Sequence, residues 1–271
     1  MLVRILLLFF STIFVHNAAA SSSDCTCSTA ESSSKNTDVT TSSPTTRSMS
    51  SYSTVTTTAT TSTYSTVNPD NTICPHLHIM DDMTRNKSIT AHNFRRSRLA
   101  QGMVKNKNGK NLPPASNMLK LLYHCHLEFG AFESARRCSL SPLSGLRPGV
   151  QENIDLITKS EAQNPQGAII EAIKHWWSPV RKDGGVGQGV TYTAYNEGKP
   201  ISWFTRMAWA TTKYLGCAVH SCGNSQWSVV CHYFGNNVSE HIYEKGTPCT
   251  ACPTGYFCDS EKLCAPNITA K

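Results

Sequence analysis

The pattern of apolar residues predicts four α-helices in the second part of the chain. The clearest pattern is at 118–132, where apolar residues recur at helical spacing along one face. Further helices are predicted at 84–99, 166–177 and 204–211. Gly102 follows the first of them, and a glycine just past the last turn commonly ends a helix. The predicted helices have apolar stripes, so each needs another layer of structure to cover it.

That second layer is predicted around residues 217–219 and 227–233. Both stretches are rich in β-branched and aromatic residues, which predicts two antiparallel strands. The glycine-rich stretch 184–189 has no strand before it and no helix after it, so it is a loop and not a nucleotide-binding motif. Helices and a small sheet together indicate a domain of the α+β class.

The first 71 residues have a different composition from the rest. Residues 1–20 carry one Arg, a short apolar run and small residues at the end, which predicts a secretory signal peptide. Residues 21–71 are mostly Ser and Thr and cannot bury enough apolar surface to fold. We expect them to be disordered and O-glycosylated, with an unmodified flexible linker as the alternative. No later run of apolar residues is long enough to span a membrane. With the predicted signal peptide, this indicates a secreted, extracellular protein.

Cysteines and glycosylation sequons agree with this compartment. Twelve cysteines in a secreted chain should mostly form disulfides. Cys25 and Cys27 precede the Ser/Thr-rich segment, and their partners stay open. The spacing of Cys249 and Cys252 would also suit a redox motif or half of a zinc site, but disulfides are favoured in an oxidising compartment. N-glycosylation is predicted at Asn86, Asn237 and Asn267.

Several segments in the right order resemble the CAP superfamily of cysteine-rich secretory proteins, and its nematode venom-allergen-like branch in particular. The tandem Trp176-Trp177 and the run Gln151–Ile154 match short family segments. The longer matches are Ala91–Arg96 of the opening helix, Phe204–Trp209 and Val229–Tyr233 of the two signatures, and Ile242–Cys252 of the C-terminal extension.

The resemblance implies a three-layer α-β-α sandwich over residues 72–245, followed by a cysteine-rich tail over 246–271. It also implies disulfides between Cys217 and Cys231 and between Cys138 and Cys222. Within the body, Cys74 and Cys125 then remain as a pair. Two more pairs are left among Cys249, Cys252, Cys258 and Cys264, with their connectivity open.

Members of the family often carry a cleft with two His and two Glu, which can hold a divalent metal. In this sequence the first His position is Pro142, the first Glu is Glu152, the second Glu is Pro179 and the second His is Trp203. Proline has no side-chain ligand atom, and the indole nitrogen of tryptophan only donates. We therefore expect no metal, no cofactor and no enzymatic activity. Trp203 predicts a filled cleft, through solid packing or, as the alternative, around an apolar ligand.

Other histidines do not replace the missing pair. His124 and His126 lie two apart on the predicted second helix, so they should face different sides. His175 and His220 are not placed like the cleft pair either, and we expect ordinary surface or partly buried histidines. Glu152 alone is expected to be a structural hydrogen-bond acceptor.

Charge suggests a binding surface. The formal net charge is +7, and no nucleic-acid-binding module is present. A basic patch is predicted from Arg95, Arg96, Arg98, Lys105, Lys107 and Lys110. It could bind an acidic host protein or glycan, or it could be an ordinary solvated surface. The sequence thus favours a secreted parasite protein that binds host molecules; the alternatives are a lipid or sterol carrier and, less favoured, a metal-dependent hydrolase.

Overall fold

A four-stranded sheet lies at the centre of the part of the chain that the computed structural model describes, residues 71–234 and 241–267. In spatial order the strands are β1 (Leu122–Tyr123), β3 (Tyr214–Cys222), β4 (Gln226–Phe234) and β2 (Val150–Thr158). β4 pairs antiparallel with both neighbours, whereas β1 runs parallel to β3. The predicted antiparallel strand pair is confirmed. β2 is an additional strand that the apolar pattern did not reveal.

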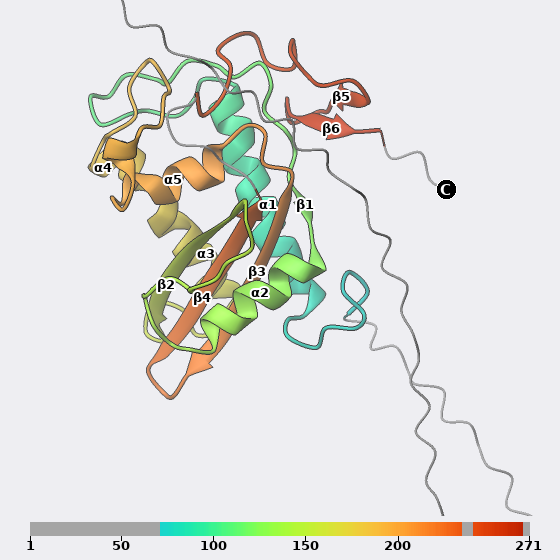
Figure 1. Ribbon diagram of the computed structural model, residues 1–271, viewed down its shortest axis with the longest axis vertical. Helices are drawn as coiled ribbons and strands as arrows, with labels where there is room; N and C mark the ends of the chain where they lie inside the picture. The colour runs from blue at the N-terminus through green and yellow to red at the C-terminus, as the bar shows by residue number, and fades with distance from the viewer. Residues whose placement is uncertain (1–70, 235–240, 268–271) are drawn as a thin grey trace, which may run out of the picture. The chain divides into compact units, whose positions relative to one another are not determined.

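Helices cover both faces of this sheet, which gives the expected α-β-α sandwich (Figure 1). On one face α2 (Cys125–Ala135) packs Ala131 and Ala135 against Ile154, Ala218 and Val230 of the sheet. The other face is covered by a larger core, to which α3 contributes Ile169, Ile173 and Trp176. The helices on that side are α1 (Asp82–Ala100), α3 (Pro165–Trp177) and α5 (Ile201–Ala208).

Gly216 brings α2 into direct contact with the sheet. A Cβ atom at this position of β3 would lie 2.2 Å from the backbone nitrogen of Glu128 and 2.4 Å from the carbonyl carbon of Leu127. No side chain fits between the two backbones, so only glycine permits this packing distance. The close approach fixes the position of the first turn of α2, from which several pocket residues project.

The sequence prediction for residues 118–132 is wrong in its first half. The chain is extended up to His124, and the helix begins only at Cys125. Backbone N–H groups of this extended segment donate to distant carbonyls: Leu122 to Lys213 at 2.9 Å and His124 to Leu215 at 2.8 Å. Pairing with β3 therefore replaces the helical hydrogen bonds that the apolar spacing predicted.

The other predicted helices are present with shifted ends. α1 extends to Ala100, and Gly102 follows with φ of +69°. α3 ends at Trp177, and Pro179 then begins the short helix α4 (Pro179–Lys182). The helix predicted at 204–211 is α5, three residues earlier, because Trp209 is already extended. A single 3₁₀ turn, η1 (Ala194–Asn196), precedes α5.

Arg96 is buried in the core, so it does not belong to the predicted basic patch. Its guanidinium group donates five hydrogen bonds of 2.7–3.0 Å to four backbone carbonyls. The acceptors are Leu119, and Met207, Trp209 and Ala210 at the end of α5. Every N–H group of the side chain is therefore satisfied. Burial lowers the pKa of Arg96 to about 9, which leaves it charged at neutral pH.

A second buried arginine joins α1 to α2. Arg85 forms a bidentate ion pair with Glu128, with both N–O distances at 2.7 Å and both side chains fully buried. The hydroxyl of Tyr123 donates to the same carboxylate at 2.7 Å. Hydrogen bonds thus saturate both charged groups, as a buried ion pair requires.

Five disulfides are present in the described part of the chain. Three lie in the body: Cys138–Cys222 and Cys217–Cys231, which the family resemblance implies, and Cys74–Cys125, which was expected as the remaining pair. The tail is closed by Cys249–Cys258 and Cys252–Cys264.

The tail forms a small ribbon of β5 (Tyr256–Cys258) and β6 (Cys264–Pro266) that lies against the body. The N–H of Lys120 donates to the carbonyl of Cys264 at 2.9 Å, and the Lys120 ammonium group contacts Asp259 and Glu261 at 2.8 and 2.7 Å. Hydrogen bonds and ion pairs therefore hold the cysteine-rich tail against the body, in addition to the covalent connection of the chain.

Some sequence predictions concern residues outside the described ranges. These are the signal peptide, the Ser/Thr-rich segment with Cys25 and Cys27, and the sequon at Asn237. Asn86 and Asn267 are exposed, as an acceptor of N-glycans must be, and their glycosylation stays a prediction. In the described ranges, the helices are all too short or too polar to cross a membrane.

We predict that Arg96→Lys lowers the free energy of unfolding by about 3 kcal/mol or more, because buried carbonyls lose their donors. Urea denaturation at pH 7 measures this. The exposed neighbour Arg98 provides the control, since Arg98→Lys should change stability by no more than about 0.5 kcal/mol. Equal effects of the two substitutions would contradict the structural role of Arg96.

We also predict a pH dependence of stability from His92 on α1. Its ring is buried between the carbonyl of Ser88 and the hydroxyl of Tyr233, at 2.8 and 2.9 Å, and burial lowers its pKa to about 3 from 6.5. The unfolded chain therefore binds a proton below about pH 6.5 that the folded chain does not. The free energy of unfolding therefore falls as pH decreases from about 6.5 to about 3, by at most about 1.4 kcal/mol per pH unit.

Urea denaturation between pH 7 and pH 5 tests this prediction. The wild-type protein should lose about 2 kcal/mol more over this interval than His92→Gln, which cannot titrate there. Parallel stability curves for the two proteins would show that His92 is not the titrating group.

Candidate functional site

The four positions of the family cleft differ in their surroundings. Glu152 on β2 is buried, and Pro179 is buried at the start of α4. Pro142 is exposed in the loop between α2 and β2. Trp203 on α5 is 37% exposed, so it is only partly covered. The filling of the cleft by Trp203 stays a prediction.

Glu152 is held by two hydrogen bonds. Its Oε2 lies 2.8 Å from Nε2 of His232, which is directly opposite on β4, and its Oε1 accepts from the N–H of Leu143 at 2.9 Å. Burial alone would raise the pKa of Glu152, but these two hydrogen bonds outweigh it and the pKa is lowered. The carboxylate therefore stays ionised and binds the loop that contains Leu143.

Asn153 points to the opposite face of the sheet, where it orders the start of α5. Its Nδ2 donates to the carbonyl of Trp203 at 3.0 Å, and its Oδ1 accepts from Arg206 at 3.2 Å. The Glu-Asn pair thus connects the edge strand β2 to two separate segments. Trp203 takes part through its backbone, which any residue could provide.

These residues do not fit a divalent metal. A catalytic zinc needs about three protein ligands and an open position. In the described ranges, the only cluster of three His, Cys, Asp or Glu ligand atoms within 4.8 Å is Cys249, Cys252 and Cys264. All three sulfurs are in disulfides, so they are not thiolate ligands. Glu152 already has two partners, and neither Pro142 nor Trp203 can replace a histidine ligand.

His124 and His126 lie together, against our expectation that they face different sides. His124 precedes α2 in an extended conformation, with φ of −139°, so helical spacing does not apply to the pair. The two ring centroids are 5.5 Å apart, and the ring of Tyr214 lies 5.1 Å from His124. Burial is the main cause that lowers the pKa of His124, and the nearby His126 lowers this pKa further.

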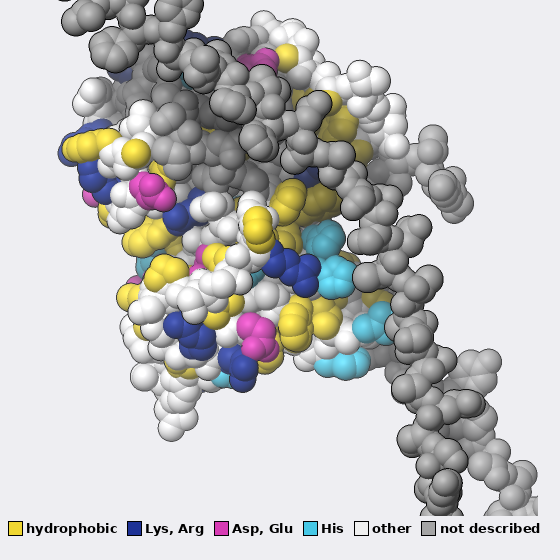
Figure 2. All heavy atoms as spheres, in the orientation of Figure 1, with side chains coloured by type: hydrophobic (Ala, Val, Ile, Leu, Met, Phe, Trp, Pro, Cys, Tyr) yellow, Lys and Arg dark blue, Asp and Glu magenta, His cyan; other side chains and the backbone are white. Residues whose placement is uncertain are grey.

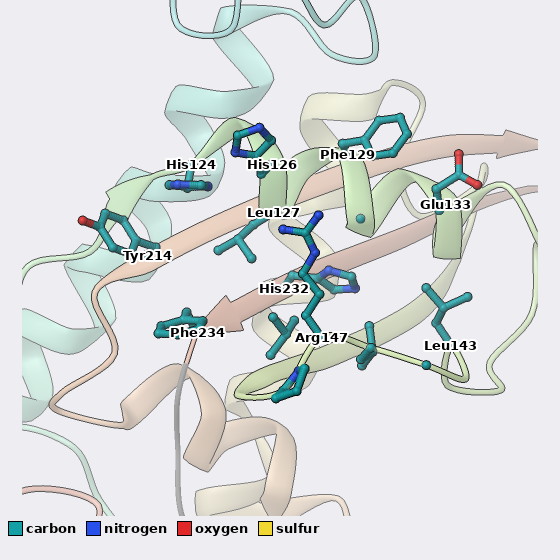
Figure 3. A pocket seen from close by; sticks show the side chains of 15 residues that line it. His124, His126, Leu127, Phe129, Glu133, Leu143, Arg147, Tyr214, His232 and Phe234 are labelled. Carbon is teal, nitrogen blue, oxygen red and sulfur yellow. The ribbon is translucent and has the colours of Figure 1, made fainter. Parts of the chain in front are cut away.

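Both histidines line a cavity of about 510 Å³ beside α2 (Figure 3). The walls come from α2, from the loop at 143–148 and from the ends of β3 and β4. His232 lies in the wall beneath Gly130, where an added Cβ would come within 2.9 Å of its Nδ1. Figure 2 shows histidine, basic and hydrophobic side chains gathered on the surface where α2 lies.

The remaining histidines singled out in the sequence have ordinary contacts. Nδ1 of His175 lies 2.9 Å from the carboxylate of Asp155 on the exposed surface of α3 and β2. The ring of His220 contacts Phe132 edge-on. Neither residue lines the cavity beside α2.

Two residues of this region were not identified from the sequence as site residues: His232 and Arg147. The register of β2 and β4 places Glu152 opposite His232, and that register is not visible without knowing that β2 is a strand. Arg147 is part of an irregular loop that no sequence period describes.

Comparison with known proteins gives the family. The model of the cysteine-rich secretory protein family, CAP, matches residues 89–233. The Ancylostoma secreted protein of Ancylostoma caninum is 34% identical over 210 residues, which cover 74% of this chain and 49% of that protein. This chain therefore spans about half the length of that relative. Hookworm platelet inhibitor 1 of the same species is 29% identical, over 71% of this chain and 86% of that protein.

A solved structure supports the same assignment. The crystal structure of NaASP2 with Zn²⁺ superimposes with a TM-score of 0.63 at 32% identity, covering 69% of this chain and 97% of that one. The family match spans more than half of the chain and includes the sheet, α2, α3 and α5. The chain therefore belongs to the CAP family of cysteine-rich secretory proteins.

Proposed function

We propose that this chain is a secreted, non-enzymatic nematode protein that acts by binding host proteins. The main support is the cleft: three of its four family positions lack a ligand or proton-transfer group, and the fourth, Glu152, is engaged by His232 and Leu143. The names of two relatives, a secreted protein and a platelet inhibitor, agree with extracellular action by binding.

The basic loop offers the binding surface. Lys105, Lys107 and Lys110 are exposed in the loop after α1. Lys107 lies against the loop that follows α4, since a Cβ on Gly184 would come within 3.2 Å of the Lys107 side chain. The exposed Arg181 and Lys182 precede that glycine. The two loops thus form one basic surface without Arg96, and an acidic partner complements it.

A lipid carrier is the second candidate, because an open groove with apolar and polar walls lies along α1 beside Ile170 of α3. Its volume is about 770 Å³, and Met83, Phe94 and Ile170 contribute to its walls. Met83 and Phe94 are 62% and 59% exposed, which is unusual for large apolar side chains. A glycan on Asn86, which also lines the groove, would stand at its rim.

We predict that the cleft of the wild-type protein binds no zinc in the micromolar range and supports no hydrolysis. Trp203→His should restore one ligand and give weak binding, and Pro142→His in addition should be needed for tight binding. Calorimetric titration with zinc measures each step. Micromolar binding by the wild-type protein that Glu152→Ala abolishes would contradict a non-enzymatic cleft.

For the basic surface, we predict that Lys105→Glu, Lys107→Glu and Lys110→Glu together abolish capture of host plasma proteins by the immobilised glycosylated chain. The matched control carries Lys213→Glu, Lys245→Glu and Lys262→Glu, which change the net charge equally at exposed positions elsewhere. Mass spectrometry compares the captured proteins, which should be lost only with the first variant.

The same capture experiment separates a protein partner from an acidic glycan. Capture that survives treatment of the plasma proteins with glycosidases supports direct protein binding. Capture that disappears after this treatment, or that the control variant loses equally, would contradict the proposal.

A further inference from the structure

The cavity beside α2 has no part in the proposed binding of host proteins through the basic loops. None of the four cleft positions, Pro142, Glu152, Pro179 and Trp203, is among the fifteen residues that line it, although the two partners of Glu152, His232 and Leu143, are. Its volume of about 510 Å³ is in the range of small-molecule sites. Such cavities are mostly apolar with a few polar groups that orient the ligand.

Aromatic side chains form much of its wall. His124, His126, Phe129, Tyr214 and Phe234 all line it, from three separate elements. Phe129 and Phe234 are each 50% exposed, so part of each ring is open to the cavity side. The ring of Phe234 packs against Gly149, where an added Cβ would lie 3.4 Å from it. Flat, exposed ring faces favour a ligand that is itself a flat ring.

His124 is held in this wall without hydrogen bonds from its ring. Nδ1 is buried and has no hydrogen-bond partner among the residues described. The ring is therefore positioned by its contacts with Tyr214 and His126. An unsatisfied buried polar atom in a native protein calls for an explanation, and a wall that adjusts to a ligand supplies one.

The cavity also contains an unpaired positive charge. Arg147 lines it, and in the part of the chain described here its guanidinium group has no carboxylate or hydrogen-bond partner. Figure 3 shows this group extending from the loop toward the side of α2 that carries His126. A free guanidinium group beside apolar surface is suited to bidentate binding of a carboxylate.

We propose that this cavity binds an aromatic carboxylic acid, with its ring between the aromatic side chains and its carboxylate on Arg147. His126 also lines the cavity and offers a polar ring nitrogen there. Glu152 and His232 act as positioning residues, because the bond from Leu143 to Glu152 fixes the loop that carries Arg147.

Two carboxylates near the cavity do not neutralise the positive charge of Arg147. Glu133 lines the cavity but is paired with Arg136 at 2.7 Å. Glu152 is not a lining residue and faces His232. The free charge that a ligand meets is therefore positive.

Isothermal titration of the full chain with naphthalene-2-carboxylate tests the proposal. We expect saturable binding at one site, and binding of the neutral naphthalene-2-carboxamide at least roughly tenfold weaker, since it lacks the charge that Arg147 recognises. Decanoate, which has the carboxylate without a ring, should also bind more weakly. No saturable binding of the naphthoate, or equal or tighter binding of either analogue, would overturn the proposal.

Two substitutions locate the site. Arg147→Gln should weaken naphthoate binding roughly tenfold or more, whereas the matched control Arg137→Gln, at an exposed arginine outside the cavity, should not change it. Leu146→Trp should block binding by filling the cavity. Melting curves must show that each variant is folded. Equal affinity of Arg147→Gln and Arg137→Gln would overturn the assignment to this cavity.

These results are independent of the proposed function. The substitutions in the basic loop should abolish host-protein capture and leave naphthoate binding unchanged. Arg147→Gln should weaken naphthoate binding and leave host-protein capture unchanged. Failure of one proposal is thus distinguishable from failure of the other.

Discussion

The guanidinium group of Arg96 determines how the segments around α1 can be arranged. It is a full charge in the core without a carboxylate partner, so backbone carbonyls must satisfy all of its N–H groups. Two of the four acceptors, Met207 and Trp209, lie at the C-terminal end of α5, where carbonyls lack helical partners and the helix dipole is negative, and Ala210 follows directly. The end of α5 and the segment at Leu119 must therefore both lie at α1. This arrangement in turn places β1 next to β3 and gives the tail a surface to pack on.

The same principle explains the present role of Glu152. A buried carboxylate needs donors, and in this chain they are His232 and the backbone of Leu143. The residue that would serve a metal site elsewhere in the family here holds a loop in place. The loop also carries Arg147, so the hydrogen bond between Glu152 and Leu143 helps to position the positive charge of the cavity beside α2.

Much of the fold could be predicted from the sequence, because local signals and the family segments agree. α3 and the β3–β4 pair follow from their own residues, and the body disulfides follow from the resemblance. The extended segment before α2 could not be predicted, since its hydrogen-bond partners, such as Lys213 and Leu215, are about 90 residues away in the chain. For the site, Glu152 and the absence of cleft ligands were visible in the sequence. The burial of Arg96, the convergence of His124 with His126 and the position of Arg147 depend on tertiary contacts.

The long-range bonds of Arg96 also have a consequence for the order in which the chain can fold during synthesis. The acceptors at Met207, Trp209 and Ala210 emerge 111–114 residues after the arginine. Cys264, which receives the N–H of Lys120, emerges later still. The first helix is made early, but the hydrogen bonds of Arg96 cannot form until residues 207–210 have been synthesised. The core around Arg96 therefore forms only after these distant segments are available. Cys74 and Cys138 likewise stay without their partners until 51 and 84 further residues have been made.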